Sequence, residues 1–324
     1  MNIYTSTLDY ISNLPVVKAW DGAITLLDHA AVLQPRDWQL PITACEAMGG
    51  LAEAALPASA AIACAQIGII LIDDLLDDDP RGAYHRLGAA QTANYAAAFL
   101  TMALQAILHG PARPSTKLAA TQSLNQMLTT IAFGQYLDTQ NPEDEAAYWR
   151  VVQTKSAPFF GTALELGALF GDGSAKIVNE IRKIGCLYGE MIQIHDDLHD
   201  CMTEPAGPDW IKGRSSLPII FAQTVDHPEG IRFLELCKKI SDLEVLHEAQ
   251  SILIRCGSVS YCIDQLLHRY QTARNILTSM KLAQPNNVDR LLESLIAPVW
   301  KLLGTDEKQW LTLPTSAEYF EREV

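Results

Sequence analysis

The chain has little positive charge, no closely spaced cysteine pair and no strand-like pattern. Only 24 Lys and Arg stand against 38 Asp and Glu in 324 residues, which gives a formal net charge of −14. An acidic surface argues against nucleic acid and anionic membranes as partners, because both bind clustered Lys and Arg. The 7 cysteines form no C-x-x-C pair, so we expect reduced thiols in a cytoplasmic protein. No run alternates apolar and polar residues, which argues against a β-sheet.

Two long uncharged stretches, 54–72 and 87–108, approach the length of a membrane-spanning helix. The first contains Pro57, Ser59 and Gln66, and the second is dominated by alanine, which is too weakly apolar to drive insertion. We therefore predict two buried core helices and no stable membrane span. The N-terminus also lacks the charged head and apolar run of a signal peptide.

Apolar residues recur at helical period along nearly the whole chain. Proline and glycine breaks such as Asn141-Pro142 separate the periodic segments. We predict an all-α fold, a single-domain bundle of about ten or more helices around a central apolar cavity. The domain covers residues 1–324, with 1–15 and 305–324 as candidate peripheral segments. The expected helices are 16–32, 39–55, 58–79, 87–109, 115–138, 143–171, 175–201, 229–240, 243–255, 258–281 and 286–303.

The helix predicted over 58–79 ends in an acidic run, Asp73-Asp74-Leu75-Leu76-Asp77-Asp78-Asp79. Asp73 and Asp77 are four residues apart, so their carboxylates lie on one helical face about 5–6 Å from each other. The two charges repel, and the helix dipole disfavours negative charge near a C-terminus. A divalent cation removes this repulsion, and Mg²⁺ is typically held by a few carboxylates together with a substrate phosphate.

The run Asp196-Asp197-Leu198-His199-Asp200 repeats this spacing on a second long helix. One such match alone is ordinarily a solvated acidic helix end. Two matches in one helical bundle favour facing metal sites that share one diphosphate between them. Lys155 and Arg214 are candidate cations for the same diphosphate.

Four motifs, in this order, resemble those of the trans-isoprenyl diphosphate synthase (polyprenyl synthetase) family, which has the class I isoprenoid synthase fold. Asp73-Asp74-x-x-Asp77 is similar to its first aspartate-rich motif, and Gln193-x-x-Asp196-Asp197-x-x-Asp200 to its second. Lys155-Ser156 resembles the family's Lys-Thr pair. The loop Gly213-Arg214-Ser215-Ser216-Leu217-Pro218 resembles Gly-Lys-x-Thr-Leu-Pro, with Arg in place of Lys. The match is good over about residues 40–225.

The resemblance implies an enzyme that ionises an allylic prenyl diphosphate with Mg²⁺, about three ions, with Mn²⁺ as an alternative. It also implies a homodimer. The implied catalytic residues are Asp73, Asp77, Asp196 and Lys155, and the implied metal residues are Asp73, Asp74, Asp77, Asp196, Asp197 and Asp200. The implied diphosphate-binding residues are Lys155, Gln193, Arg214 and Arg81.

The isopentenyl diphosphate site of the family is largely missing. Its Gly-Gly-Lys-x-x-x-Arg-Pro segment reads Pro35-Arg36-Asp37-Trp38-Gln39-Leu40-Pro41 here, and the histidine expected seven residues before Asp73 is Gln66. Ile72 replaces a second histidine, and Arg-Arg-Gly is reduced to Arg81-Gly82. Each lost charge-assisted contact removes about 1.5–3 kcal/mol, so a second diphosphate should bind weakly.

Gly68 and Ile69 occupy positions where family members with short products carry bulky aromatic residues. With Ile72 they are predicted to line a chain pocket that admits a prenyl chain of farnesyl length or longer. The alternative is that Gly68 merely allows close packing of two helices. Both interpretations stay open on the sequence.

The leading functional hypothesis is a prenyltransferase similar to a polyprenyl diphosphate synthase. The missing isopentenyl site favours two alternatives, a terpene cyclase on the same fold and a prenyltransferase with another acceptor, such as a glycolipid, an indole or a peptide. A non-catalytic regulatory subunit is the least favoured hypothesis, because such a subunit needs no pair of metal motifs.

Overall fold

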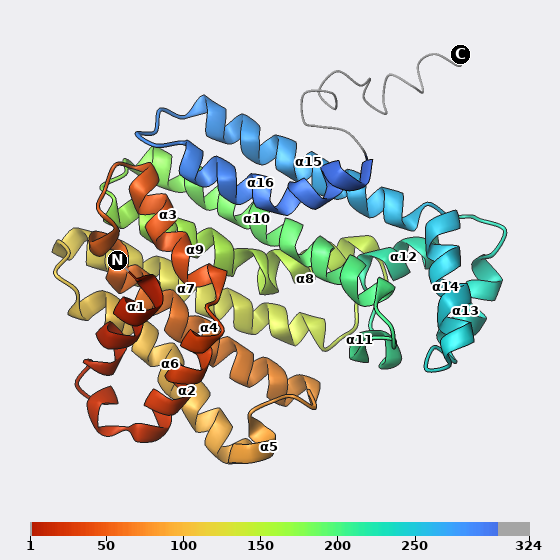
Figure 1. The fold of residues 1–324 in the computed structure, drawn as a ribbon, viewed down its shortest axis with the longest axis horizontal. Helices are drawn as coiled ribbons and strands as arrows, with labels where there is room; N and C mark the ends of the chain where they lie inside the picture. The colour runs from red at the N-terminus through yellow and green to blue at the C-terminus, as the bar shows by residue number, and fades with distance from the viewer. Residues whose placement is uncertain (1, 304–324) are drawn as a thin grey trace.

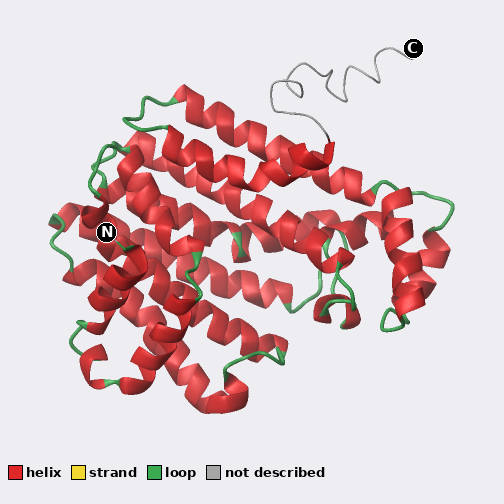
Figure 2. Ribbon diagram, in the orientation of Figure 1, coloured by secondary structure: helices red, strands yellow, loops and turns green. Residues whose placement is uncertain are grey.

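The computed structural model describes residues 2–303, except for the side chains of residues 208, 209, 302 and 303. Over these residues the chain forms helices and loops and no strand (Figure 2), so the predicted all-α class is confirmed. The predicted peripheral segment 305–324 lies outside the described residues, and the single-domain assignment of 1–324 stays a prediction.

The helices follow one another with short connections (Figure 1). They are α1 (Ile3–Ser12), α2 (Asp21–Val32), α3 (Leu40–Ala47), α4 (Leu56–Asp77), α5 (Tyr84–Leu87), α6 (Ala89–His109), α7 (Pro114–Asp138), α8 (Glu145–Lys155), α9 (Ala157–Phe170), α10 (Ala175–Met202), α11 (Pro208–Ile211), α12 (Leu217–Thr224), α13 (Gly230–Cys237), α14 (Leu243–Arg255), α15 (Ser258–Ser279) and α16 (Asn286–Leu303). Short 3₁₀ turns occur at η1 (Val17–Ala19), η2 (Arg36–Gln39) and η3 (Ala52–Ala55).

Helices α4, α9 and α10 run through the middle of the molecule and contribute a large share of its core (Figure 1). Helix α9 packs closely on α10 because the contact contains glycine. A Cβ at Gly185 would lie 2.5 Å from the carbonyl oxygen of Phe160, so only glycine permits this approach. A second, smaller apolar cluster joins the end of α10 to α11, α13 and α14.

The predicted core helix of residues 54–72 is α4. The segment Ala52–Asp77 is long and apolar enough to cross a membrane, and 72% of its most apolar window is buried in the fold. It packs against α1, α3, α6 and α9. Proline at its second residue fits the first turn, where a backbone N–H has no intrahelical partner.

The structure differs from the predicted helix ranges in several places. The range 39–55 is helix α3, a loop and the 3₁₀ turn η3. The helix expected over 143–171 is two helices that meet at Ser156, because Pro158 lacks a backbone N–H and its ring excludes a continuous helix. Helices α1, α5, α11 and α12 were not expected. They have 10, 4, 4 and 8 residues, which is too few to show a clear helical period.

Candidate active site

The first aspartate motif forms the C-terminal end of α4. Asp73 and Asp77 lie one turn apart on the face that lines a cavity of about 840 Å³. Helix α4 stops at Asp78, which has a left-handed backbone conformation (φ 51°). The chain turns there and brings Asp79 and Arg81 to the rim of the same cavity.

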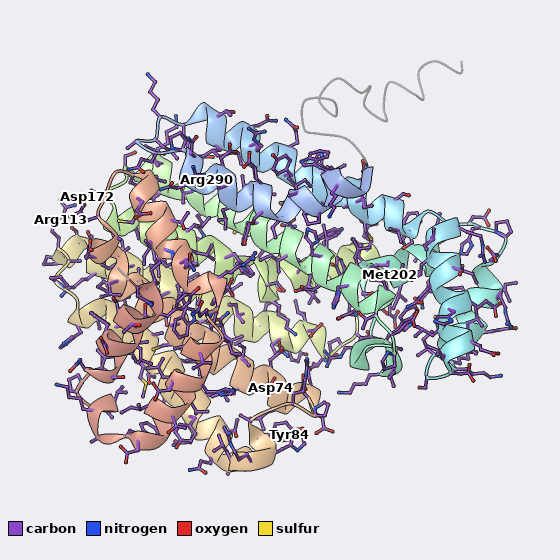
Figure 3. All side chains as sticks on the ribbon, in the orientation of Figure 1. Asp74, Tyr84, Arg113, Asp172, Met202 and Arg290 are labelled. Atoms are coloured by element: carbon purple, nitrogen blue, oxygen red, sulfur yellow. The ribbon has the colours of Figure 1, made fainter. Side chains whose placement is uncertain are left out.

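The second aspartate motif lines this cavity from α10. Asp196, Asp197 and Asp200 are all among its lining residues, together with His199. Figure 3 labels Asp74 and Met202, which mark the ends of α4 and α10 that carry the two motifs. The expectation that the motifs face each other over one hollow therefore agrees with the geometry.

Two of the cations that line the cavity, Lys155 and Arg214, contact its carboxylates directly. The ammonium of Lys155, at the end of α8, is 3.1 Å from Asp73 Oδ1 and 2.7 Å from Asp138 Oδ2. Arg214 donates from both terminal nitrogens to the Asp77 carboxylate, with Nη1 3.0 Å from Oδ2. The predicted cations and the predicted ligands of the first motif are thus in direct contact.

A hydrogen-bond chain joins α8, α9, α10 and α12 beneath the cavity. Ser156 Oγ donates to Gln193 Oε1 at 2.8 Å, and Gln193 Nε2 donates to Asp197 Oδ1 at 2.9 Å. The other Asp197 oxygen accepts from the backbone N–H of Leu217 at 2.8 Å, at the start of α12. Gln193 and Asp197 line the cavity, and their polar groups also hold the helix ends that shape it.

The sequence analysis missed Asp138 and Lys212. Asp138 ends α7 and binds Lys155, and Lys212 donates to the backbone carbonyl of Asp77. Gly134, one turn before Asp138 on α7, was the one hint in the sequence that this part of α7 lies close to another helix. A Cβ at Gly134 would lie 2.4 Å from the backbone nitrogen of Lys155, so glycine brings α7 against the end of α8.

Asn141 holds the loop that carries Arg214. Its side-chain nitrogen donates to Gly213 O at 3.2 Å, and its side-chain oxygen accepts from Ser215 N at 3.2 Å. Asn141 itself has a left-handed conformation (φ 51°), which asparagine tolerates better than most residues. The two hydrogen bonds clamp the loop on both sides of Arg214.

The carboxylates of the cavity repel one another. Burial, together with the smaller effect of the Asp200 charge, raises the pKa of Asp196 to about 6, and His199 opposes this shift. Burial also raises the pKa of Asp73, where Lys155 opposes the effect and Asp77 adds to it. Asp197 is only 6% exposed, and burial raises its pKa to about 6 as well.

These carboxylates fit Mg²⁺ by their chemistry. Oxygen ligands are what this hard cation prefers, and Asp73, Asp77, Asp196 and Asp200 all line the cavity with carboxylate groups. Over the described residues, no three Asp, Glu, His or Cys side chains come together as a ready-made metal cluster. Mg²⁺ commonly completes its coordination with water and substrate phosphate, so a shared site between the two motifs suits it.

Some predicted residues lie away from the cavity. Asp74 is not among its lining residues and lies by the backbone N–H of Ala83. Gly68, Ile69 and Ile72 do not line it either. Gly68 faces α6, where an added Cβ would lie 2.8 Å from a methyl of Leu100, so it serves the close packing of α4 and α6.

Comparisons with known proteins give one family for the part of the chain that carries these residues. The polyprenyl synthetase family model matches residues 39–253, which contain both aspartate motifs, Lys155 and Arg214. A geranylgeranyl diphosphate synthase of Methanosarcina mazei is 28% identical over 236 residues, which are 68% of this chain and 71% of the relative. Geranylgeranyl pyrophosphate synthase 2 of Zymoseptoria tritici is 30% identical over 229 residues, 64% of this chain and 65% of that protein.

Solved structures show the same fold. The geranylgeranyl pyrophosphate synthetase of the archaeon Geoglobus acetivorans superposes with a TM-score of 0.79 at 20% identity. The match covers 91% of this chain and 96% of that one. Because the family model spans well over half of the chain, the motifs, the cavity and the fold lead to one conclusion: this chain belongs to the polyprenyl synthetase family.

Proposed function

We propose that the protein is a prenyltransferase of isoprenoid biosynthesis that ionises an allylic prenyl diphosphate, in the manner of a prenyl diphosphate synthase. The relatives named above are geranylgeranyl diphosphate synthases, which supports this class of reaction. The observation that carries the proposal is that both aspartate motifs, Lys155 and Arg214 line one cavity.

Asp73, Asp77 and Asp196 would hold Mg²⁺, with Asp200 in support. The metal supplies Lewis-acid stabilisation of the departing pyrophosphate. Lys155 and Arg214 bind its oxygens by charge-assisted hydrogen bonds, which are about twice as strong as neutral ones. Arg81 lies at the rim of the cavity, where it is ion-paired with Asp79 at 2.8 Å, and can contact the same anion.

The apolar part of the cavity gives the allylic cation an environment from which water is excluded. Val151, Val152 and Ile219 line it beside the charged residues. Excluding water lowers the local dielectric and prevents capture of the cation by hydroxide or water. The predicted chain pocket at Gly68, Ile69 and Ile72 stays a prediction.

Incubation of the protein with Mg²⁺ and geranyl, farnesyl or geranylgeranyl diphosphate tests the proposal. Pyrophosphate release is expected, and Asp73→Ala or Asp196→Ala should abolish it while circular dichroism shows an unchanged helical fold. The same assay distinguishes the alternatives. A terpene cyclase releases a hydrocarbon or alcohol from one substrate alone, and a non-catalytic subunit releases no pyrophosphate.

A homodimer is part of the proposal. On α7 the side chains of Leu118, Phe133 and Tyr136 share one face and are exposed by 61%, 46% and 61%. Burial of such a face against a second copy would remove this apolar surface from water. Analytical ultracentrifugation measures the oligomeric state directly. The cytoplasmic location stays a prediction.

A further inference from the structure

Lys212 lines the cavity from the loop between α11 and α12, which also carries Arg214. Both side chains reach Asp77 at the end of α4. Arg214 contacts the Asp77 carboxylate, whereas the Lys212 ammonium donates to the Asp77 backbone carbonyl. This carbonyl belongs to the last turn of α4, where backbone oxygens have no partner within the helix. Lys212 therefore caps α4 from the same loop that supplies Arg214.

Lys212 differs from the other basic residues that line the cavity. Each of the others contacts a carboxylate: Lys155 contacts Asp73 and Asp138, Arg214 contacts Asp77, and Arg81 contacts Asp79. Among the described side chains, no carboxylate forms an ion pair with Lys212, whose hydrogen bond goes to a neutral carbonyl. An ammonium has three N–H donors, so two of them are left for a ligand. The side chain is exposed, and an anion in the cavity can reach it.

The difference in partners decides which cation gains most from an incoming phosphate. Lys155, Arg214 and Arg81 already bind aspartates, so each has to share or give up an ion pair to bind a phosphate oxygen. Lys212 only exchanges or shares a neutral carbonyl. A hydrogen bond between two charged groups is about twice as strong as one between neutral groups. Contact with a phosphate is therefore a net gain for Lys212.

We propose that Lys212 is a further diphosphate-binding residue, which donates directly to the phosphate oxygens of the allylic diphosphate. The proposal rests on the proposed function, because both need a diphosphate in this cavity. It adds a contact from the loop that the aspartate motifs, Lys155 and Arg214 do not supply. Lys212 binds the headgroup and takes part in no covalent step.

Calorimetric binding of inorganic pyrophosphate to the full chain in the presence of Mg²⁺ tests the proposal. Lys212→Gln is expected to bind pyrophosphate about tenfold more weakly than the wild type, because one charge-assisted contact is lost. Lys212→Arg keeps the positive charge, so its affinity should stay within about threefold of the wild type. Added NaCl should weaken the binding of the wild type more steeply than that of Lys212→Gln.

Lys176→Gln is the matched control, since it removes the same charge at the other end of α10. Lys176 is exposed and lies 20 residues before Asp196, about 30 Å away along the helix. Its substitution should leave the affinity for pyrophosphate unchanged. An equal loss of affinity in Lys176→Gln and Lys212→Gln would show a general effect of net charge and would overturn the proposal.

A second pair of variants distinguishes diphosphate binding from a purely structural cap of α4. Lys212→Gln retains an N–H donor for the Asp77 carbonyl, whereas Lys212→Met removes both the donor and the charge. Both variants should lose about tenfold in affinity if the charge binds the diphosphate. A loss confined to Lys212→Met, or a lower stability in urea with unchanged affinity, would mean that Lys212 only caps α4. Either result would overturn the proposal.

Nuclear magnetic resonance gives a direct readout of the contact. Reductive methylation with carbon-13 labels lysine ammonium groups and keeps their charge. The methyl signal of Lys212, assigned by its absence in Lys212→Arg, should shift when Mg²⁺ and pyrophosphate are added, and that of Lys176 should not. An unchanged Lys212 signal contradicts the proposal. Failure of the wild type to bind pyrophosphate at all contradicts the proposed function, whereas equal binding by wild type and Lys212→Gln contradicts only the role of Lys212.

Discussion

Lys155 Nζ lies 3.1 Å from Asp73 Oδ1 and so joins the end of α8 to the first aspartate motif. The same ammonium is 2.7 Å from Asp138, which ends α7. Burial lowers the pKa of Lys155, but the two carboxylates outweigh this effect and raise it overall. One cation therefore neutralises two carboxylates on two other helices, and it also faces the cavity in which a diphosphate would bind.

Lys155→Met should abolish pyrophosphate release and destabilise the protein by about 1–3 kcal/mol, because Asp73 and Asp138 then lose their shared cation. Urea unfolding measures the loss. The double variant Lys155→Met with Asp138→Asn should recover most of the stability and none of the activity. If the second substitution restores no stability, the ion pair contributes little and this explanation is wrong.

The stability of the metal-free protein should rise when the pH falls from 7 to 5. The pKa of buried Asp197 is about 6 in the fold and near 4 in the unfolded chain, so the folded state takes up this proton first. The stabilisation is complete below about pH 4 and is lost as the pH rises to about 6, and about 1 kcal/mol is expected from this group between pH 7 and 5. Urea titrations at both pH values measure it.

Asp197→Asn is the matched variant for this pH dependence. It should flatten the difference between pH 7 and 5, whereas Asp28→Asn on the exposed face of α2 should leave the difference unchanged. An equal pH dependence in all three proteins would show that Asp197 does not hold a proton near pH 6.

Asn141→Gly should weaken the binding of pyrophosphate about tenfold, because the loop of Arg214 loses two hydrogen bonds. Glycine keeps the left-handed backbone conformation, so the variant removes the side chain alone. Limited proteolysis should cut the Arg214 loop faster than in the wild type. Unchanged affinity and unchanged cleavage would show that the loop holds its position without Asn141.

Gly68→Ala should destabilise the protein by about 1–3 kcal/mol, since the new methyl would lie 2.8 Å from a methyl of Leu100 and 3.1 Å from Ala96 O. The loss should be smaller in a Leu100→Ala background, where one collision partner is gone. Thermal unfolding of the wild type, the two single variants and the double variant gives the coupling free energy between positions 68 and 100. Gly68→Phe tests the chain-pocket prediction only if the variant folds, and a shorter longest accepted substrate is then expected.

The sequence predicted which residues form the site better than it predicted the contacts between them. Two D-x-x-x-D spacings on helices fix which carboxylates share a face, so the pairs Asp73–Asp77 and Asp196–Asp200 were accessible from local geometry. The contacts of Lys155 with Asp138 and of Asn141 with the Arg214 loop depend on how distant helices meet, and local periodicity does not contain this information. The break at Ser156 was predictable from Pro158.

Binding of inorganic pyrophosphate to the full chain, measured by calorimetry with and without Mg²⁺, tests the central claim most directly. The account predicts that Mg²⁺ strengthens the binding at least about 100-fold, and that Asp73→Asn and Asp196→Asn each remove most of this gain. Pyrophosphate binding that is indifferent to Mg²⁺, or that survives both substitutions, would contradict a metal site shared by the two aspartate motifs.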